Sequence, residues 1–390
     1  MKLTFCAGSD QFASVSGFSD GLTRNAQMCP TLGGGAATQP TLVSAGYDKI
    51  IRFWHVATGQ AIHTIHQPES QLNSMALSAT GERLATAGYQ RIRLYDLAHG
   101  TAPFDFDCSS RNVTAVGFEQ SSKWMYSGGE DMTARIWDLR ARQLTCQRIF
   151  QVNTAVNTVC LHPNQVELFV GDASGTLYSW DLRNNANEQA PLEAPGVPVS
   201  IQHLAVDPDG TKLAAVTNRG DAYLWSLVSS STGLTDGAAV QQQQQHDDVA
   251  DDNATGGGTA AGAPVRSTKW VPKKKFRVHE RYALRCAFSP DNTLLATTSA
   301  DQTCRVWTTA DLCQMTVLQK SSSNSSSSNT NNDGMKWVWD CAFTNDSQHL
   351  FTCSSDGLLR LWDVATGETL RTYHGHKGVV TCLAFRDISV

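Results

Sequence analysis

The stretch that decides the fold is LRLWDV at residues 359–364, a short apolar segment that ends in the pair Trp362 and Asp363. Six other segments end in the same way, with an aromatic residue that Asp follows in most copies. They are IIRFWH at 50–55, IRLYDL at 92–97, ARIWDL at 134–139, LYSWDL at 177–182, AYLWSL at 222–227 and CRVWTT at 304–309. The first five aromatic residues lie 41, 42, 43 and 45 positions apart. A Trp-Asp pair repeated every ~40–45 residues is the signature of a four-stranded propeller blade.

Each repeat has the same order of strands and turns. An apolar strand leads to a polar turn such as SPDN at 289–292, and a second strand follows, such as LLATTS at 294–299. A tight turn with Asp then precedes the strand that ends in the aromatic residue, and a fourth strand leads to the next repeat. Strands of ~5–6 residues joined by turn residues are typical of all-β folds. We therefore predict an all-β protein, a seven-bladed WD-repeat β-propeller.

The two ends of the repeat array predict how the ring closes. The array begins with a second strand, TLVSAGYD at 41–48, and ends with an isolated first strand, VVTCLAF at 379–385. Seven first strands are expected, at 72–78, 113–118, 156–161, 200–206, 282–288, 337–343 and 379–385. The C-terminal strand should therefore complete the blade that starts near Thr41, which leaves no long unpaired edge on that blade.

Three segments do not follow the repeat. Residues 1–40 are rich in Gly, Ser, Thr and Asn, and we expect a disordered N-terminal tail before a propeller that spans 41–390. A low-complexity insertion with a Gln run, at about 228–266, is expected between the third and fourth strands of blade 5. A Ser/Asn-rich insertion at about 320–334 should join blade 6 to blade 7. Such long loops are tolerated because the entropic cost of closing a loop grows slowly with its length.

Composition indicates the class of partner and the compartment. The chain has 31 basic and 36 acidic residues and a net charge of −5, which argues against nucleic acid as its main partner. A lysine run at 273–275 is interpreted as a solvated strand edge, with an anionic contact as the alternative. No apolar run approaches ~18 residues, so direct insertion into a membrane is not expected. Eleven cysteines without a CxxC pair, and the lack of a secretory signal, favour a reducing cytoplasmic location and argue against a metal site.

Side-chain hydrogen bonds among His, Ser or Thr, Asp and Trp are expected to hold the blades together. Blade 6 offers His279, Thr297, Asp301 and Trp307, and blade 1 offers His376, Ser44, Asp48 and Trp54 once the C-terminal strand closes it. Blades 3 and 7 lack an evident His, and Gln90 and Tyr95 replace the Asp and Trp of blade 2. A His–Asp–Ser set also resembles a nucleophilic triad. Because the set recurs with the blade period, we interpret it as structural.

No catalytic motif is found in the sequence. The patterns GxSxG, GxxxxGK[ST] and HExxH, which carry nucleophilic, phosphate-binding and zinc chemistry, are absent. The acidic pair Glu130-Asp131 falls in a turn, and the pair Asp247-Asp248 falls in the low-complexity insertion. We therefore expect a scaffold that is not an enzyme and needs no cofactor.

The candidate partner-binding residues belong to the loops of one face of the ring. The face with the tight turns and the loops into the inner strands, called the upper face below, is a common ligand face of propellers. The candidates on it are Tyr47, Gln71, Asn73, Tyr89, Glu130, Trp337 and Trp339. They come from blades 7, 1, 2 and 3, which are neighbours in a ring, so they should form one arc. Exposed large aromatic residues mark binding hot spots. The alternative is that Trp337 or Trp339 merely caps the core.

Several runs give the chain a family resemblance. SAGYDKIIRFW at 44–54, TAGYQRIRLYDL at 86–97, KWMYSGGEDMTARIWDLR at 123–140 and WVW at 337–339 resemble the small WD-repeat subunit of the target-of-rapamycin kinase complexes. This family is called Lst-eight or G-protein-β-subunit-like. The resemblance covers all seven repeats, about 41–390 without the insertions. Gln90 in place of the second turn Asp and the paired tryptophans are traits of that family rather than of WD repeats in general.

The resemblance implies a function. In this family the ring sits on the C-terminal lobe of the kinase domain and stabilises the active site without taking part in the chemistry. The family is shared by two complexes that control growth and the cytoskeleton. Gln71, Trp337 and Trp339 match positions where the family meets the kinase. The implied partners are the target-of-rapamycin kinase and its complex subunits, and the implied location is the cytoplasm, peripheral on endomembranes through the kinase complex.

A second hypothesis is a substrate receptor of a cullin-RING ubiquitin ligase. WDxR strings occur at 137–140 and 180–183, and such strings mark propellers that bind the ligase adaptor. The simpler explanation is an Arg that follows the Trp-Asp pair in a solvated turn. A general ribosome or vesicle-coat scaffold is a third hypothesis, and it would require a basic face that this acidic chain lacks.

Overall fold

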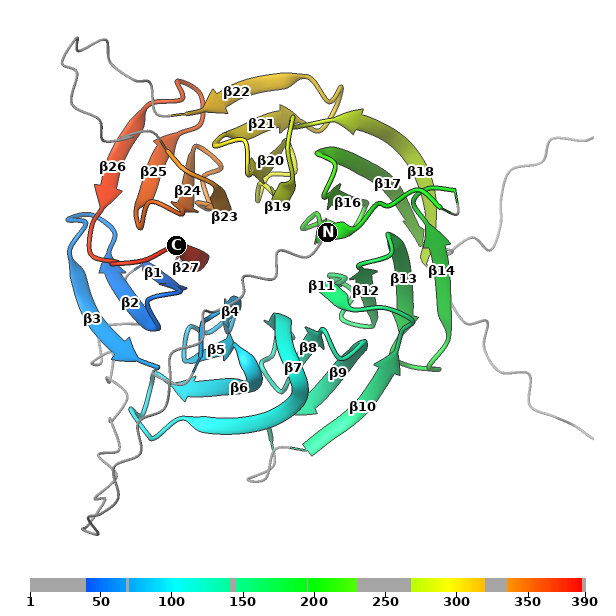
Figure 1. Cartoon of the computed structure of the whole chain (residues 1–390), viewed down its shortest axis with the longest axis horizontal. Helices are drawn as coiled ribbons and strands as arrows, with labels where there is room; N and C mark the ends of the chain where they lie inside the picture. The colour runs from blue at the N-terminus through cyan, green and yellow to red at the C-terminus, as the bar shows by residue number, and fades with distance from the viewer. Residues whose placement is uncertain are drawn as a thin grey trace, which may run out of the picture.

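A computed structural model describes residues 40–67, 70–140, 145–194, 196–229, 268–319 and 335–387. In these ranges all helical or strand structure is β-strand. Figure 1 shows the strands grouped in radial sheets around a central axis, with the first strand of each sheet next to that axis. The described part of the chain is therefore the all-β propeller that the Trp-Asp repeat predicts.

Blades 1 to 3 contain strands β1 to β10 and the last strand of the chain, β27. From the axis outwards, blade 1 consists of β27 (Val380–Arg386), β1 (Thr41–Gly46), β2 (Ile50–His55) and β3 (Ala61–His66). Blades 2 and 3 share one sheet, which contains β4 (Ser74–Leu77), β5 (Arg83–Ala87), β6 (Tyr89–Asp96), β7 (Phe104–Phe118), β8 (Trp124–Gly129), β9 (Thr133–Asp138) and β10 (Thr145–Gln151).

Blades 4 to 7 are separate four-stranded antiparallel sheets. Blade 4 has β11 (Val156–Leu161), β12 (Glu167–Asp172), β13 (Thr176–Asp181) and β14 (Asn187–Pro191). Blade 5 has β15 (Ile201–Val206), β16 (Lys212–Thr217), β17 (Asp221–Ser229) and β18 (Thr268–Arg277). Blade 6 has β19 (Ala283–Phe288), β20 (Leu294–Ser299), β21 (Cys304–Thr308) and β22 (Gln314–Leu318), and blade 7 has β23 (Val338–Phe343), β24 (His349–Ser354), β25 (Leu359–Asp363) and β26 (Thr369–Tyr373).

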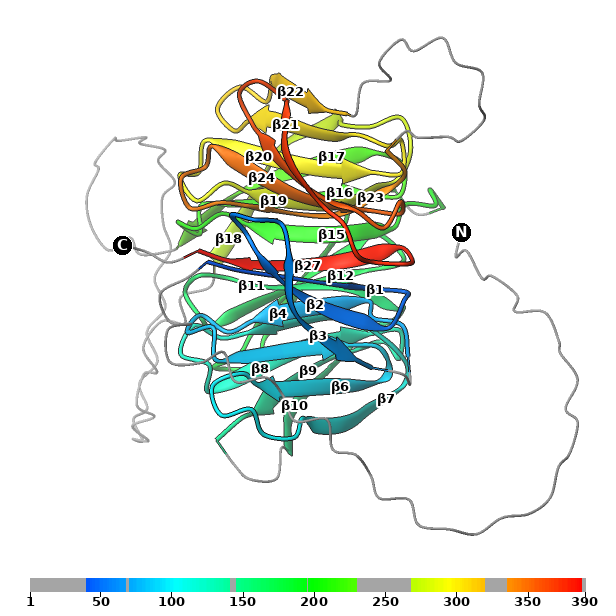
Figure 2. The same ribbon diagram turned by 90° about the vertical axis from the view of Figure 1, so that its left-hand side faces the viewer.

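The C-terminal strand closes the ring. β27 pairs antiparallel with β1, so that Leu42 lies opposite Phe385 and Ser44 lies opposite Leu383. Figure 2 shows β1 and β27 side by side, although they come from opposite ends of the described chain. The inner strands contact one another in the cyclic order β27, β4, β7, β11, β15, β19, β23 and back to β27. The prediction of a propeller closed by its last strand is confirmed.

Blades 2 and 3 depart from the expected separate sheets. β7 is a continuous strand of 15 residues that pairs with β6 as the outer strand of blade 2 and with β8 as the inner strand of blade 3. Tyr89, expected in a tight turn, is the first residue of β6 and lies opposite Asn112. The register shifts between Tyr89 and Arg91, and Gln90 between them has a φ of 64°. The chain still reverses here as expected, because Ala87 pairs with Ile92 and the Gly88 N–H donates to Arg91 O at 3.1 Å, so Tyr89 and Gln90 lie in the tight turn between β5 and β6.

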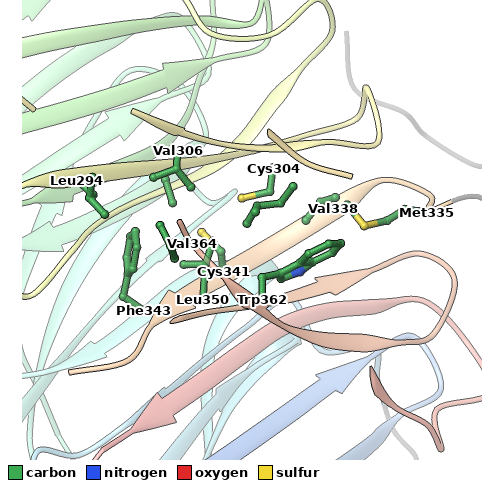
Figure 3. Close-up of a cluster of buried hydrophobic side chains, with 12 residues drawn as sticks. Leu294, Cys304, Val306, Met335, Val338, Cys341, Phe343, Leu350, Trp362 and Val364 are labelled. Atoms are coloured by element: carbon green, nitrogen blue, oxygen red, sulfur yellow. The ribbon is translucent and has the colours of Figure 1, made fainter. Parts of the chain in front are cut away.

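Apolar side chains fill the spaces between neighbouring blades. The cluster in Figure 3 joins blade 6 to blade 7, and it contains Val306 and Cys304 from β21, Val338 and Cys341 from β23, and Trp362 from β25. Burying a side chain of the size of Val, Leu or Phe contributes ~1.5–3 kcal/mol. Each blade presents such side chains on both faces, so its stability depends on both neighbours.

Hydrogen bonds also join every blade to the next on the lower face, opposite the tight turns. The seven bonds are Arg386 Nε to Ala79 O, Arg83 Nη1 to Ser122 O, Gln120 N to Gln165 Oε1, His162 Nε2 to Gly210 O, Asn292 Nδ2 to Asp209 Oδ2, Asp291 N to Ser347 Oγ and Asn345 N to Asp387 Oδ2. Two of the seven are made by residues at the end of β27. The series of hydrogen bonds between blades is therefore complete only when the C-terminal strand is paired.

The predicted insertions lie mostly outside the described residues. β17 extends to Ser229, so Val228 and Ser229 belong to a strand rather than to the insertion expected from residue 228. They pair with Lys269 and Thr268 of β18. The remainder of that insertion, residues 320–334 and residues 1–39 lie outside the described residues, so the predicted tail and low-complexity insertions stay predictions.

Candidate partner-binding rim

Three aromatic rings form a cluster on the upper rim, where blade 7 meets blade 1. The ring centroids of Trp337 and Trp339 are 5.7 Å apart, and those of Trp339 and Tyr47 are 6.4 Å apart. Tyr47 is 42% exposed, and both tryptophans are partly exposed. Tyr47, Trp337 and Trp339 are called the aromatic rim cluster below. Binding hot spots are enriched in Trp and Tyr, so an exposed cluster of these residues is a candidate binding site.

Backbone and side-chain hydrogen bonds fix the cluster. The backbone N–H of Tyr47 donates to Val379 O at 2.9 Å, just before β27 begins. The indole Nε1 of Trp339 donates to Ser355 Oγ at 2.6 Å, and the backbone N–H of Ser355 donates to Trp337 O at 2.9 Å. Trp339 also packs partly on the core between blades 7 and 1, whereas Trp337 belongs to none of the buried clusters. Burial raises the pKa of the Tyr47 phenol.

The other candidates lie around the opening of the ring. The residues that line a central cavity of about 570 Å³ include Tyr47, Trp339, Asn73 and Glu130. The structure therefore brings these four predicted residues to one cavity. Asn73 is already engaged, because its Nδ2 donates to Val113 O at 3.2 Å and so links blade 2 to blade 3. A bond between blades rather than contact with a partner accounts for the position of this side chain.

Gln71 and Tyr89 are exposed on blade 2. Tyr89 is 55% exposed, the highest value among the aromatic residues of this rim. Gln71 precedes β4 and is also exposed. Among the described residues, no ring pair or side-chain hydrogen bond joins either of them to the aromatic rim cluster. The predicted arc therefore consists of one tight aromatic cluster and separate exposed side chains on the neighbouring blade.

Deeper in the cavity, one arginine connects three blades. The Arg285 Nη1 donates to His203 Nε2 at 3.0 Å, and its Nε lies 3.5 Å from Asp340 Oδ1. The Asp340 carboxylate also accepts the backbone N–H groups of Cys341 and Leu383, at 2.8 and 3.0 Å. Burial raises the pKa of Asp340 against the opposing charge of Arg285. Burial, assisted by Arg285, lowers the pKa of His203 well below its usual range, so this ring is neutral and suited to accept the arginine N–H.

Comparisons with known proteins assign the family. The family model "WD domain, G-beta repeat" matches residues 101–138, 144–181, 270–308 and 328–363. Target of rapamycin complex subunit LST8 from Bos taurus is 45% identical over 348 residues, which is 89% of this chain and 94% of the relative. The chain belongs to the LST8 family. Its relatives also include Protein LST8 homolog from Drosophila melanogaster, 39% identical over 90% of this chain and 98% of the relative, and LST8 from Saccharomyces cerevisiae, 36% identical over 89% and 99%.

In this LST8-family chain, two blades assemble the predicted set of four side chains. In blade 6, His279 Nδ1 lies 2.9 Å from Asp301 Oδ2 and its Nε2 lies 2.9 Å from Thr297 Oγ1, which accepts the Trp307 indole N–H at 3.0 Å. If the proton is on Nδ1, the ring donates to the carboxylate and accepts from the hydroxyl, which satisfies every member. Both His279 and Thr297 are fully buried between strands, so the set has no access to a substrate.

Blade 1 has the same arrangement around His376. The ring contacts Asp48 and Ser44 at 2.8 and 2.7 Å, and Ser44 accepts the Trp54 indole N–H at 2.8 Å. Burial would raise the pKa of Asp48, but the hydrogen bond and charge of His376 lower it below its ordinary value. The same balance around His279 lowers the pKa of Asp301.

In blades 3 and 7, which lack the His, an arginine pairs with the turn Asp, a contact that the sequence analysis missed. In blade 3, Arg135 Nη2 lies 2.8 Å from Asp131 Oδ2, and in blade 7, Arg360 Nη2 lies 2.5 Å from Asp356 Oδ2. Each Arg stands two positions before the blade Trp, where its guanidinium can reach the turn Asp from the same strand. Arg305 of blade 6 has the same spacing and lies 3.9 Å from Asp301, so the repeated spacing was a signal for an arginine beside the turn Asp, whether or not a His is present.

Blade 2 uses a glutamine instead. The buried Gln67 accepts hydrogen bonds at 3.2 Å from the Tyr95 phenol and the Thr86 hydroxyl through its Oε1. Gln67 thus occupies the place of His in a blade whose Trp is replaced by Tyr. Because Gln67 lies in a polar loop with no motif around it, nothing in the sequence marked it.

The described residues contain no group of three His, Cys, Asp or Glu side chains that could hold a metal ion. A search of the same residues for a helix long and apolar enough to cross a membrane found none.

Proposed function

We propose that this LST8-family chain is a non-catalytic subunit of a target-of-rapamycin complex, which binds the kinase subunit through its upper rim and stabilises the kinase domain. The relatives from cattle and yeast are named as target of rapamycin complex subunits, and they align with nine-tenths of this chain. The complex would place the protein in the cytoplasm, and on endomembranes through the kinase. Its role in growth and cytoskeletal signalling would follow from that of the kinase.

The observation that supports this proposal most is the aromatic rim cluster. Tryptophan and tyrosine are enriched at hot spots because they bury 150–250 Å² each at a low entropic cost. At ~25 cal/mol per Å², covering the exposed part of two such rings contributes several times the thermal energy. Hydrogen bonds hold the backbone of Tyr47 and Trp337 and the indole of Trp339, which reduces the ordering needed on binding.

Co-purification from cells tests the proposal. The tagged full chain with Trp337→Ala and Trp339→Ala should lose the kinase subunit, while the ring keeps its fold by circular dichroism. Trp270→Ala is the matched control, because Trp270 is also a partly exposed tryptophan but lies on the outer strand of blade 5. Trp339 contacts the core, so Trp337→Ala alone provides a second variant that removes rim surface only. Unchanged recovery of the kinase with both rim variants would overturn the proposal.

Binding to a cullin-RING ligase adaptor is a second candidate, and one observation supports it. In blades 3 and 4 the Arg of each WDxR string forms an ion pair with the Asp of its own string, Arg140 with Asp138 at 2.6 Å and Arg183 with Asp181 at 2.9 Å. The two arginines remain 70% and 48% exposed at the ends of the third strands, on the lower face. Replacing both by Ala should remove an adaptor from the same pull-down and leave the kinase bound. Loss of neither protein would reject the ligase function.

A further inference from the structure

Two lysines flank the aromatic rim cluster. Lys336 is exposed and directly precedes Trp337. Lys377 is exposed in the loop before β27, and its backbone N–H lies 3.3 Å from Oδ2 of Asp48, the residue that follows Tyr47. The two ammonium groups are therefore carried by the segments that hold the aromatic rings. Among the described residues neither lysine forms an ion pair.

Two aspartates of the same rim already form contacts within the protein. The side chain of Asp48 is 6% exposed and contacts His376. The side chain of Asp356, which follows the Ser355 that holds Trp339, is 14% exposed and pairs with Arg360. Glu130 lines the same cavity as Tyr47 and Trp339, but it belongs to blade 3. Among the described residues of blades 7 and 1, the exposed charge next to the three rings is therefore basic, although the whole chain has a net charge of −5.

We infer that the partner segment that docks on the aromatic rim cluster is acidic and carries an apolar side chain next to its carboxylates. The apolar side chain would pack on Trp337, Trp339 and Tyr47, and the carboxylates would face Lys336 and Lys377. This inference rests on the proposed function, and it adds the chemistry of the kinase segment that the rim selects. A basic segment would meet two like charges at this site, which disfavours it.

Charge at the edge of an apolar contact acts mainly on the rate of association. Oppositely charged surfaces steer the encounter, and salt screens that attraction with a Debye length of about 10 Å at 0.1 M. Reversing both lysines changes the local charge by four, so association with an acidic segment should slow strongly at low salt. The effect should shrink at high salt, whereas the loss from truncating the rings should not.

The experiment measures binding of the full chain to purified kinase subunit at 50 and 500 mM KCl. The variant K336E/K377E is compared with K269E/K273E, which reverses two exposed lysines of β18 on blade 5. We expect the rim variant to associate about tenfold or more slowly than the wild type at 50 mM, with the difference falling to about twofold at 500 mM. The control variant should stay within about twofold of the wild type at both concentrations.

The outcomes separate this inference from the proposed function. If the Trp337→Ala and Trp339→Ala variants lose the kinase but K336E/K377E binds like the control, the partner segment is not acidic and only the inference fails. Faster association of K336E/K377E would show a basic segment and would also overturn it. If neither the aromatic nor the charge variants change binding, both the inference and the proposed function fail.

Discussion

Nδ1 of His376 lies 2.8 Å from Oδ2 of Asp48, a carboxylate 328 positions earlier in the chain. On its other side, Nε2 of the same ring lies 2.7 Å from Oγ of Ser44 in β1. The loop before the C-terminal strand is thus bonded to the strand that opens the array. Closure of the ring therefore depends on these contacts and on the pairing of β27 with β1, which join the two ends of the repeat array.

Removing the closing histidine should weaken the whole ring. His376→Ala leaves the buried Asp48 and Ser44 without their partner, so we expect the free energy of unfolding to fall by about 1–3 kcal/mol. Urea unfolding followed by tryptophan fluorescence measures the change. His374→Ala, two positions earlier at an exposed site, is the control and should have little effect. Equal losses in the two variants would show that the hydrogen-bonded set does not stabilise the closure.

The complete set of blade 6 should matter more than its divergent counterpart in blade 2. Asp301→Ala removes the carboxylate that His279 and Thr303 contact, at 2.9 and 2.6 Å. Gln90→Ala changes an exposed side chain at a bulge and leaves the buried Gln67 set in place. We expect the melting temperature to fall further with Asp301→Ala. Equal thermal shifts would contradict the structural role assigned to the set.

The buried arginine of blade 7 should contribute more to the free energy of unfolding than an exposed arginine does. The Arg360 side chain is 4% exposed, and Arg360→Met would leave the Asp356 carboxylate, which is 14% exposed, without its charged partner. Breaking such a pair costs about 3–5 kcal/mol. Arg140→Met removes an ion pair whose Arg is 70% exposed, and solvent already screens that pair. Denaturant midpoints should separate the two variants clearly, and a loss for Arg140→Met as large as that for Arg360→Met would argue against this assignment.

Acid should destabilise the ring through the turn aspartates. Folding lowers the pKa of Asp48 and Asp301 below their ordinary values, so the unfolded chain binds more protons. The resulting stability is fully present above the pKa of an unfolded Asp, about 3.9, and is lost as the pH falls through the lower folded values. Urea unfolding between pH 2 and 6 should give a smaller acid loss for Asp301→Asn than for the wild type. An identical slope in both proteins would contradict the shift at Asp301.

The regular part of the fold was predictable because short segments of sequence determine its strands and turns. The spacing of the aromatic residues fixed the blades, and the isolated strand at 379–385 could only pair with the segment at 41–48. The continuous β7 was not predictable. The sequence between Phe104 and Phe118 shows no pattern for one strand, and its path depends on pairing with both β6 and β8.

The candidate site was predictable only in part. Turn and strand positions placed Tyr47, Trp337 and Trp339 on neighbouring blades, but side-chain contacts between them depend on the three-dimensional ring. Asn73 was predicted to bind the partner from the start of the inner strand of blade 2, whereas its side chain bonds to the carbonyl of Val113 on the next blade. A polar residue at a strand start has the same local sequence whether its partner is another protein or the adjacent blade.

The affinity of the purified ring for the kinase subunit tests the central claim most directly. Trp337→Ala removes a rim ring that lies outside the buried clusters, and Trp270→Ala removes a tryptophan from blade 5. Truncating a hot-spot anchor costs ~2 kcal/mol or more, which corresponds to about a 30-fold weaker Kd. We expect that loss for Trp337→Ala and a Kd within about twofold of the wild type for Trp270→Ala. Wild-type affinity of Trp337→Ala, with the ring folded, would contradict the claim that the aromatic rim binds the kinase.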